Sequence, residues 1–241
     1  MKFNKLKVSS NNNVFLISSI PFHLDLEKTA EKFRISPESK EFHTLEDMLE
    51  KAQEVGIPKA LYRVGYIDKR IEESIFINGT EFKSRVLRVN LEDADRVFLY
   101  VITCGMEIEE WSKSYNDPFF AYIVDYIKES VLGCAVSFFF NYIRKTYKLS
   151  KFSKMAPGSL KDWPIEQQRQ LFDTIGDVEK AAGVILKESF LMVPSKSVSG
   201  IIFPTEVSFE SCILCPREKC PSRRASYNST LYNERYSISH S

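Results

Sequence analysis

Histidine is scarce in this sequence, and neither sign of charge is in excess. The chain has 3 histidines, and its 33 lysine and arginine residues balance 32 aspartate and glutamate residues. His23, His43 and His240 are scattered along the chain, which argues against a Ser-His-Asp hydrolase and against a histidine-rich catalytic metal site. The charge balance argues against an extended surface for polyanions, so nucleic acid is not an expected partner.

The sequence also lacks the common nucleotide and metal motifs and a membrane anchor. G-x-G-x-x-G, G-x-x-x-x-G-K-S/T and H-E-x-x-H are all absent. Residues 1–13 contain no apolar stretch of the kind found in secretory signals. The most apolar segment, 119–143, is interrupted by Asp125, Lys128 and Glu129, which is typical of a buried helix rather than a bilayer span. We therefore expect a cytoplasmic protein that makes no membrane contact.

The order of apolar patterns predicts an α+β fold. Asn78-Gly79 separates two strand-like runs, and this dipeptide is a strong hairpin signal. Strands are expected at 14–20, 60–67, 74–77, 81–89, 96–103, 184–186, 190–193 and 198–203. Helices are expected at 25–33, 36–55, 107–115, 117–147 and 164–172, with a loop over 149–162. The mixed order of helices and strands favours the α+β class over an alternating βαβ chain.

Composition divides the chain into three expected parts. Residues 1–205 form one α+β domain, and the overall 44% of hydrophobic residues is enough for a core without disulfides. Residues 206–228 form a cysteine-rich segment for a metal or cluster. Residues 229–241 are polar and are expected to form a flexible tail.

One segment, 183–203, has a distinctive order of residues. It reads Gly183-Val-Ile-Leu-Lys-Glu-Ser-Phe-Leu-Met-Val-Pro-Ser-Lys-Ser-Val-Ser-Gly-Ile-Ile-Phe203. The segment resembles the activation (reactivation) domain family of cobalamin-dependent methionine synthase, whose pattern is G-x-x-L-x-E-S-x-x-M-x-P-x-x-S-V-S-G. Upstream, Lys154-Met-Ala-Pro-Gly-Ser159 stands where that family has R-x-x-x-G-Y. The resemblance covers roughly residues 118–205, and it would make this chain a free-standing short form with a C-terminal cysteine cluster.

The resemblance implies a bent, mainly antiparallel sheet flanked by helices and a site for S-adenosylmethionine (AdoMet). The small residues of Ser-Val-Ser-Gly let the backbone approach a ligand closely, and Pro-Gly predicts a tight turn that exposes backbone groups. The residues implied for the cofactor are Lys154, Ala156, Pro157, Gly158, Trp163, Ser197, Ser199 and Gly200. A plainer interpretation is that these residues and their apolar neighbours only pack a sheet and turn the chain.

Three positions depart from the family pattern. Lys154 replaces an arginine, and a lysine is a point charge that makes no bidentate contact with a carboxylate. Ser159 replaces a tyrosine, for which Trp163 is expected to supply a substitute aromatic face. Ser137 stands where the long helix of the family carries an acidic residue.

The cysteines predict a metal site. Cys212, Cys215 and Cys220 follow the spacing C-x2-C-x4-C, and basic residues nearby would stabilise their thiolates. Cys104 follows an expected central strand and is predicted as the fourth ligand, whereas Cys134 lies inside the long helix and is predicted to belong to the core. The candidates, in order, are a four-iron iron–sulfur cluster, a structural zinc and plain reduced thiols.

The resemblance implies an accessory protein of corrinoid metabolism that acts in methionine biosynthesis. Such a protein binds AdoMet and supports reductive methylation of a corrinoid, beside a methyltransferase, without catalytic residues of its own. The chain lacks the D-x-H-x-x-G pattern of cobalamin-binding proteins. The corrinoid is therefore expected to come from a corrinoid protein, or from a methionine synthase without its own activation domain, with an electron donor as a further partner. The alternatives are a docking module without AdoMet binding and a zinc-stabilised scaffold unrelated to corrinoids.

Overall fold

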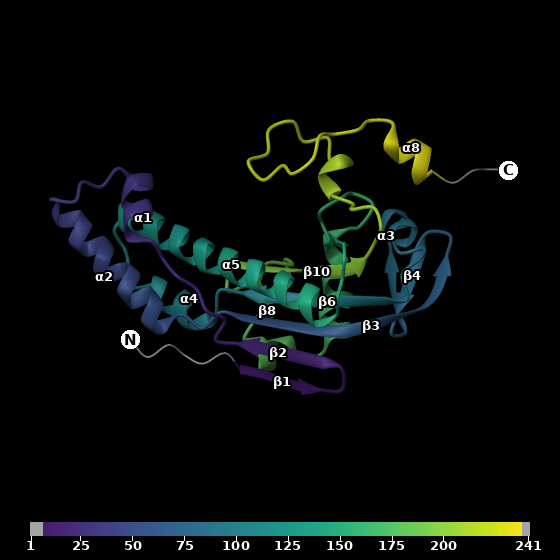
Figure 1. Cartoon of the computed structure of the whole chain (residues 1–241), viewed down its shortest axis with the longest axis horizontal. Coiled ribbons are helices and arrows are strands. Elements are labelled where there is room, and N and C mark those ends of the chain that lie inside the picture. The colour runs from purple at the N-terminus through teal and green to yellow at the C-terminus, as the bar shows by residue number, and fades with distance from the viewer. Residues whose placement is uncertain (1–6, 238–241) are drawn as a thin grey trace. The chain divides into compact units, whose positions relative to one another are not determined.

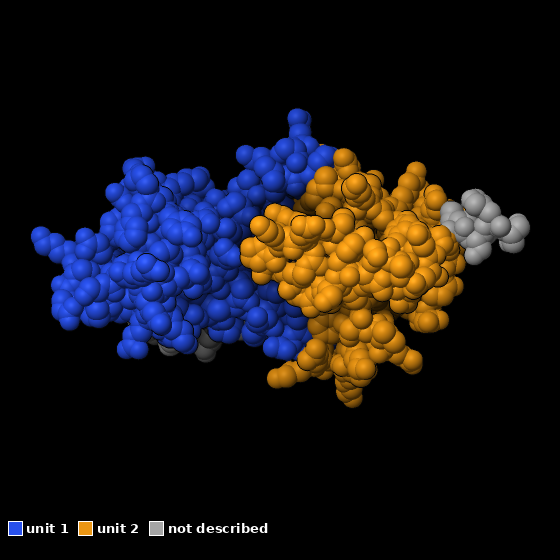
Figure 2. Space-filling model, turned by 90° about the horizontal axis from the view of Figure 1, so that it is seen from above, with its two compact units in different colours: residues 1–61, 101–143, 178–198 blue, residues 62–100, 144–177, 199–241 orange. Residues whose placement is uncertain are grey.

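The computed structural model of this protein describes residues 7–237 (Figure 1). These residues form two compact units, which Figure 2 shows in blue and orange. Unit 1 comprises the described residues of Met1–Leu61, Val101–Ile143 and Val178–Val198. Unit 2 comprises those of Tyr62–Tyr100, Arg144–Asp177 and Ser199–Ser241.

The main sheet has eight strands with the order β1-β2-β3-β6-β10-β7, to which β4 and β5 are added through β3. These strands are β1 (Lys7–Asn11), β2 (Val14–Ser18), β3 (Lys59–Ile71), β4 (Ser74–Ile77), β5 (Thr80–Lys83), β6 (Arg96–Thr103), β7 (Phe152–Met155) and β10 (Ser197–Pro204). A second sheet pairs β8 (Ile185–Leu186) with β9 (Met192–Val193). The pairs β1–β2, β3–β4, β4–β5, β7–β10 and β8–β9 are antiparallel. The α+β class with a mainly antiparallel sheet flanked by helices is thus confirmed.

The helices are set by local capping signals. Asp25 accepts a hydrogen bond from the backbone N–H of Lys28 (3.0 Å), and Ser39 accepts one from that of Phe42 (3.2 Å), as expected at helix N-termini. The helices are α1 (Leu26–Phe33), α2 (Lys40–Val55), α3 (Arg85–Asn90), α4 (Met106–Ser112), α5 (Pro118–Thr146), α6 (Gln168–Ile175), α7 (Val178–Ala182) and α8 (Leu231–Arg235). Short 3-10 turns occur at Ile165–Gln167 and Ser211–Ile213.

Unit 1 has a core built largely from α2, α4 and α5. One cluster of buried residues includes Leu45 and Met48 of α2, Ile123 and Ile127 of α5, and Cys104 at the end of β6. Asp125, Lys128 and Glu129 keep α5 from being uniformly apolar. None of the helices in the described part of the chain has the length and apolar character of a bilayer span.

Unit 2 contains the β4–β5 hairpin and the parts of β3, β6 and β10 that do not belong to unit 1. Its fully buried side chains include the large aromatic residues Tyr62, Phe82, Phe98, Trp163 and Phe203. The hairpin turn is the one predicted from Asn-Gly: both residues have positive φ, 48° and 78°, between the paired residues Ile77 and Thr80. This is the geometry that a two-residue type I′ turn requires.

Several elements differ from the sequence-based expectation, among them β1 and α7, which were not expected at all. The run 81–89 was predicted as one strand, but β5 ends at Lys83 and α3 begins at Arg85, because Ser84 caps that helix by accepting from the Leu87 N–H (2.9 Å). The expected loop 149–162 contains β7, and the expected start of α2 at residue 36 moves to Lys40. The expected flexible tail contains α8 and the side chain of Tyr236, which is only 1% exposed.

Candidate functional site

Lys154 lies on β7 opposite Ile202 of β10. Its side chain is half-buried. Burial and the nearby positive charge of Arg224 lower the pKa of the Lys154 ammonium group, and the carboxylate of Glu210 opposes this shift. Lys154 therefore lies in a partly desolvated environment with charges of both signs nearby.

The turn predicted from Pro157-Gly158 is present. The Ser159 N–H donates to the Ala156 carbonyl oxygen (3.1 Å), and Gly158 has a φ of 78°. Proline and a positive-φ glycine at the two central positions are the signature of a type II turn. A side chain at Gly158 would also collide with Ile165, whose Cδ1 lies 2.8 Å from the position of a built Cβ.

Several polar groups of this turn already have hydrogen-bond partners within the same segment of the chain. The Gly158 N–H donates to the Trp163 carbonyl oxygen (2.7 Å), and the Ser159 hydroxyl donates to the Ala156 carbonyl oxygen (2.6 Å). The expectation that the turn exposes backbone groups for a ligand is therefore wrong for the Gly158 N–H.

Trp163 does not supply the aromatic face that was expected of it. The side chain is 0% exposed and packs edge-on against Phe82, with ring centroids 6.2 Å apart. Its indole Nε1 is buried without a hydrogen-bond partner among the described residues. The order of residues indicated an aromatic near the turn but not its direction, which is set by the core of unit 2.

The Ser-Val-Ser-Gly residues lie on β10 and have structural contacts. In unit 1, the Ser197 hydroxyl oxygen lies within hydrogen-bond distance of the Thr103 hydroxyl (2.9 Å) and of the Pro194 carbonyl oxygen (2.8 Å). In unit 2, the Ser199 hydroxyl accepts from the side-chain amide of Gln168 (3.2 Å).

Gly200 allows two groups of unit 2 to approach the strand closely. A Cβ at this position would lie 2.5 Å from the Met155 carbonyl oxygen and 2.9 Å from the Tyr100 hydroxyl. Burial raises the pKa of the Tyr100 phenol, which keeps it neutral. The glycine thus has a packing reason inside β10, whereas the plainer interpretation of the motif expected it to turn the chain there.

The cysteine-rich segment contacts the β7 edge and the turn. The Phe209 N–H donates to the Ser153 hydroxyl (2.6 Å), and the hydroxyls of Ser211 and Ser159 are 3.5 Å apart. Glu210, between these two contacts, forms an ion pair with Arg224 in which Oε2 and Nε are 3.1 Å apart. The sequence-based reasoning missed this neighbourhood, because nothing in the local pattern links residue 210 to residue 154.

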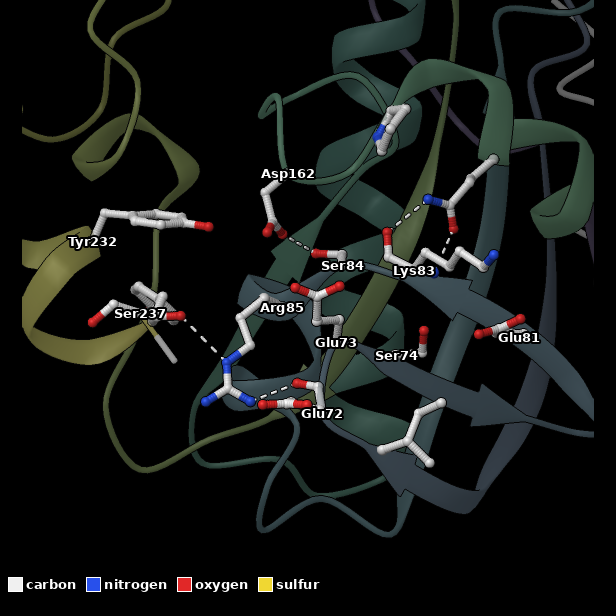
Figure 3. A pocket seen from close by; sticks show the side chains of 14 residues that line it. Glu72, Glu73, Ser74, Glu81, Lys83, Ser84, Arg85, Asp162, Tyr232 and Ser237 are labelled. Atoms are coloured by element: carbon white, nitrogen blue, oxygen red, sulfur yellow. Dashed lines mark hydrogen bonds between the residues drawn. The ribbon is translucent and has the colours of Figure 1, made fainter. Parts of the chain in front are cut away.

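Unit 2 also contains a large pocket of about 1190 Å³ beside the end of the 149–162 segment (Figure 3). Asp162 lines it and accepts hydrogen bonds from the Ser84 hydroxyl and from the Val86 N–H (2.9 Å for the latter). Arg85 donates to the backbone carbonyl oxygens of Glu72 (2.5 Å) and Tyr236 (3.3 Å). The polar lining mixes acidic, basic and phenolic side chains: Glu72, Glu73, Glu81, Asp162, Lys83, Arg85 and Tyr232.

This pocket is distinct from the predicted cofactor residues. None of the eight residues implied for AdoMet is among those that line it. Tyr232 directs its hydroxyl toward Asp162 (Figure 3), and burial, followed by the charge of Asp162, raises the pKa of the Tyr232 phenol. These contacts account for how α8 and Tyr236 are anchored in unit 2.

The structure gives no support to the predicted metal site. Among residues 7–237 no group of three or more histidine, cysteine, aspartate or glutamate side chains is placed to hold a metal ion. Cys104 is 0% exposed in the core of unit 1, and burial raises the pKa of its thiol to about 12. Cys134 is half-buried, whereas the sequence predicted that it belongs to the core.

The other three cysteines lie in a loop organised by Arg223. Its guanidinium donates to the backbone carbonyl oxygens of Cys212, Cys215 and Ala225, each at 3.1 Å, and also to that of Arg217. Cys212, Cys215 and Cys220 are free and half-buried. A metal at these three thiols stays a prediction from their spacing.

The fold is of the α+β class, with a mainly antiparallel sheet flanked by helices. A scan against protein-family models gave no match, and no curated protein is similar in sequence. Among solved structures, the chain is similar to the MetH reactivation domain bound to AdoHcy, with a TM-score of 0.57 and 15% identity. The alignment covers 77% of this chain and 67% of that one. This likeness establishes the fold.

Proposed function

We propose that this protein binds AdoMet and supports the reductive methylation of a corrinoid that is carried by a partner protein. The observation that carries the proposal is the agreement between a sequence motif and an independent structural similarity. The 183–203 motif suggested the reactivation domain from residue order alone, and the fold proves similar to a MetH reactivation domain whose structure contains AdoHcy. A cobalamin-dependent methionine synthase, or another corrinoid protein, is the proposed partner, and methionine biosynthesis is the proposed setting.

Several residues around the turn are suited to hold the ligand. Lys154 would pair with the ligand carboxylate as a single charge. The Ala156–Ser159 turn would place its backbone beside the adenine, with the positive φ of Gly158 fixing its shape. Gly200 keeps β10 close to Met155 and Tyr100, so it would define the floor of the site.

The contribution of these residues to the reaction would be binding and orientation. When bound, AdoMet would supply the methyl group, and a separate electron donor would supply one electron to the corrinoid. No residue of the turn needs to transfer a proton for this reaction, so holding the ligand in one geometry is the chain's part in the rate.

A calorimetric titration with AdoMet and with AdoHcy tests the proposal. The wild-type protein should show saturable binding, and Lys154→Ala should weaken it about tenfold or more, because one charge-assisted contact is lost. Lys161→Ala is the matched control, since Lys161 is an exposed lysine of the same segment. Equal effects of the two substitutions would contradict a specific role of Lys154.

A docking module without AdoMet binding is the second candidate. It is favoured by the internal use of the Gly158 N–H and of the Ser199 hydroxyl, and by the burial of Trp163. Such a module would retain a corrinoid protein in a pull-down with equal yield in the absence and presence of AdoMet. The AdoMet-binding accessory protein should instead release or absorb measurable heat when it is titrated with AdoMet. The amount of corrinoid protein retained in the pull-down should then depend on AdoMet.

A further inference from the structure

The proposed function does not use the pocket of about 1190 Å³ in unit 2 (Figure 3). Its walls come from the β3–β4 turn, from β5 and the start of α3, from residues 162–167 and from the α8 region. Hydrogen bonds hold two of these walls together: the side-chain amide of Gln167 donates to the Lys83 carbonyl oxygen, and its side-chain oxygen accepts from the Lys83 N–H, both at 2.7 Å. The pocket is thus a built part of unit 2.

Carboxylates predominate among the charged groups of this pocket. Four carboxylates line it, against the two cations Lys83 and Arg85. The Arg85 guanidinium is already directed at two backbone carbonyl oxygens. Three of the carboxylates, those of Glu72, Glu73 and Glu81, form no ion pair or hydrogen bond with another residue in the described part of the chain. The pocket therefore favours a cationic ligand over an anionic one.

Ser74 provides an unpartnered polar group on the wall of the same pocket. The residue is only 4% exposed, and its hydroxyl forms no hydrogen bond with any residue among 7–237. Ser74 lies opposite Lys83 in the β4–β5 pairing, so it shares one face of the hairpin with Lys83 and with Glu81, two residues earlier on β5. All three residues line the pocket (Figure 3). A buried hydroxyl that faces a cavity without a partner is suited to accept a hydrogen bond from a ligand.

Tyr232 offers an aromatic surface on another wall. It is 41% exposed, and its hydroxyl points toward Asp162 (Figure 3). The Asp162 carboxylate is held in place because it accepts hydrogen bonds from the Ser84 hydroxyl and the Val86 N–H. An accessible aromatic ring beside a fixed carboxylate suits an ammonium group, which gains both a cation–π contact and an ion pair. The pocket thus has two separate places for a positive charge.

We propose that this pocket binds a linear aliphatic polyamine, with one ammonium group beside Tyr232 and Asp162 and another beside Ser74 and Glu81. Ammonium groups separated by methylene chains match carboxylates that stand on different walls. A metal ion fits less well, because no group of three or more potential ligands is placed to hold one among the described residues. The inference is independent of the proposed function, since none of the residues implied for AdoMet lines this pocket.

Isothermal titration of the full chain with spermidine tests this proposal. The wild-type protein should bind spermidine saturably. Glu81→Gln keeps the shape of the side chain and removes its charge, so we expect it to weaken binding about fivefold. Ser74→Ala removes the hydroxyl and should weaken binding about threefold. Glu218→Gln is the matched control and should change nothing, because Glu218 is an exposed glutamate of unit 2 that does not line the pocket.

Three results would overturn the proposal. The first is no saturable binding of millimolar spermidine by the folded wild-type protein, whatever the result with AdoMet. The second is equal weakening by Glu81→Gln and Glu218→Gln, or displacement of spermidine by an equal concentration of MgCl₂, since either would indicate diffuse attraction by surface charge. The third is binding that Ser74→Ala leaves unchanged, which would overturn the place assigned to the second ammonium group. A circular dichroism melt of each variant identifies any loss of folded protein.

Discussion

The two units differ in the charged groups that surround their lysine side chains. In unit 1, the buried Lys128 faces Glu109 at 3.2 Å, Lys59 faces Glu107 at 2.9 Å, and Lys196 faces Asp125 at 2.8 Å. In unit 2, Arg224 faces Glu210 at 3.1 Å, and the charges of both side chains act on the half-buried Lys154. Lysines held against carboxylates of other elements, as in unit 1, are typical of a structural framework, whereas a half-buried lysine with a lowered pKa is a candidate for ligand binding. The comparison therefore indicates a structural role for the unit 1 pairs, and the proposed function gives Lys154 of unit 2 a binding role.

The cysteines should show the largest contrast between the units. The rise in the Cys104 pKa from 9.0 to about 12, caused mainly by burial, lowers the thiolate fraction about a thousandfold. We expect iodoacetamide at pH 8 to modify Cys212, Cys215 and Cys220 in the native protein and to leave Cys104 unmodified, as read by peptide mass spectrometry. Labelling of all five cysteines in denaturant is the control. Rapid native labelling of Cys104 would contradict the burial on which its structural role depends.

Removing one carboxylate of unit 1 should cost stability. Glu109→Ala leaves the Lys128 ammonium, which is 9% exposed, without its partner. We expect a loss of about 3 kcal/mol in the free energy of unfolding, measured by urea denaturation, because the desolvated charge is no longer compensated.

Two controls sharpen this test. Glu110→Ala removes an exposed pair with Lys113 and should change the free energy of unfolding by less than about 0.5 kcal/mol. Adding Lys128→Met to Glu109→Ala should recover much of the lost stability. Equal effects of the two glutamate substitutions would remove the distinction between a buried and an exposed pair.

A change from lysine to arginine at residue 154 should affect binding rather than stability. Lys154→Arg offers two parallel donors to a carboxylate, so AdoMet binding should tighten by about threefold. Isothermal titration measures the affinity, and a urea denaturation curve measures the stability. Weaker binding by the arginine variant would show that the site is too confined for a bidentate contact.

The smallest expected effect is a pH dependence of stability that depends on Lys154. Its pKa is lowered in the folded protein, so the charged form destabilises the fold. This cost is fully present below the folded pKa and is lost as the pH rises toward the unfolded value of 10.5. Lys154→Met should therefore be more stable than wild type at pH 7, and the difference should shrink toward pH 10.5 in paired urea denaturation curves. A difference that grows with pH would reverse the sign of the shift.

The elements whose formation depends on local patterning or turn residues were predicted correctly from the sequence. The strands at 74–77 and 96–103 and the Asn-Gly turn were predicted at their observed positions, because strand patterning and turn chemistry coincide there. The prediction of one strand over 81–89 was wrong, because the apolar pattern concealed the role of Ser84 as a helix cap. The strand β7 was missed because its four residues, Phe-Ser-Lys-Met, have no clear alternation and depend on pairing with β10.

The candidate site was predictable only in part. The tight turn at Gly158 followed from Pro-Gly. The close approach of Met155 and Tyr100 to Gly200 was not predicted, because the small residues were assigned to contact with a ligand. The direction of Trp163 depends on the unit 2 core, and the approach of Glu210 to Lys154 depends on a contact between residues 153 and 209. Both are tertiary effects that no local pattern contains.

A titration of anaerobically purified protein with AdoMet tests the central claim most directly. We predict saturable binding that is weakened by Lys154→Ala and is unchanged by Lys161→Ala. No binding of the folded wild-type protein at millimolar AdoMet would contradict the proposal and would favour a docking module built on the same fold.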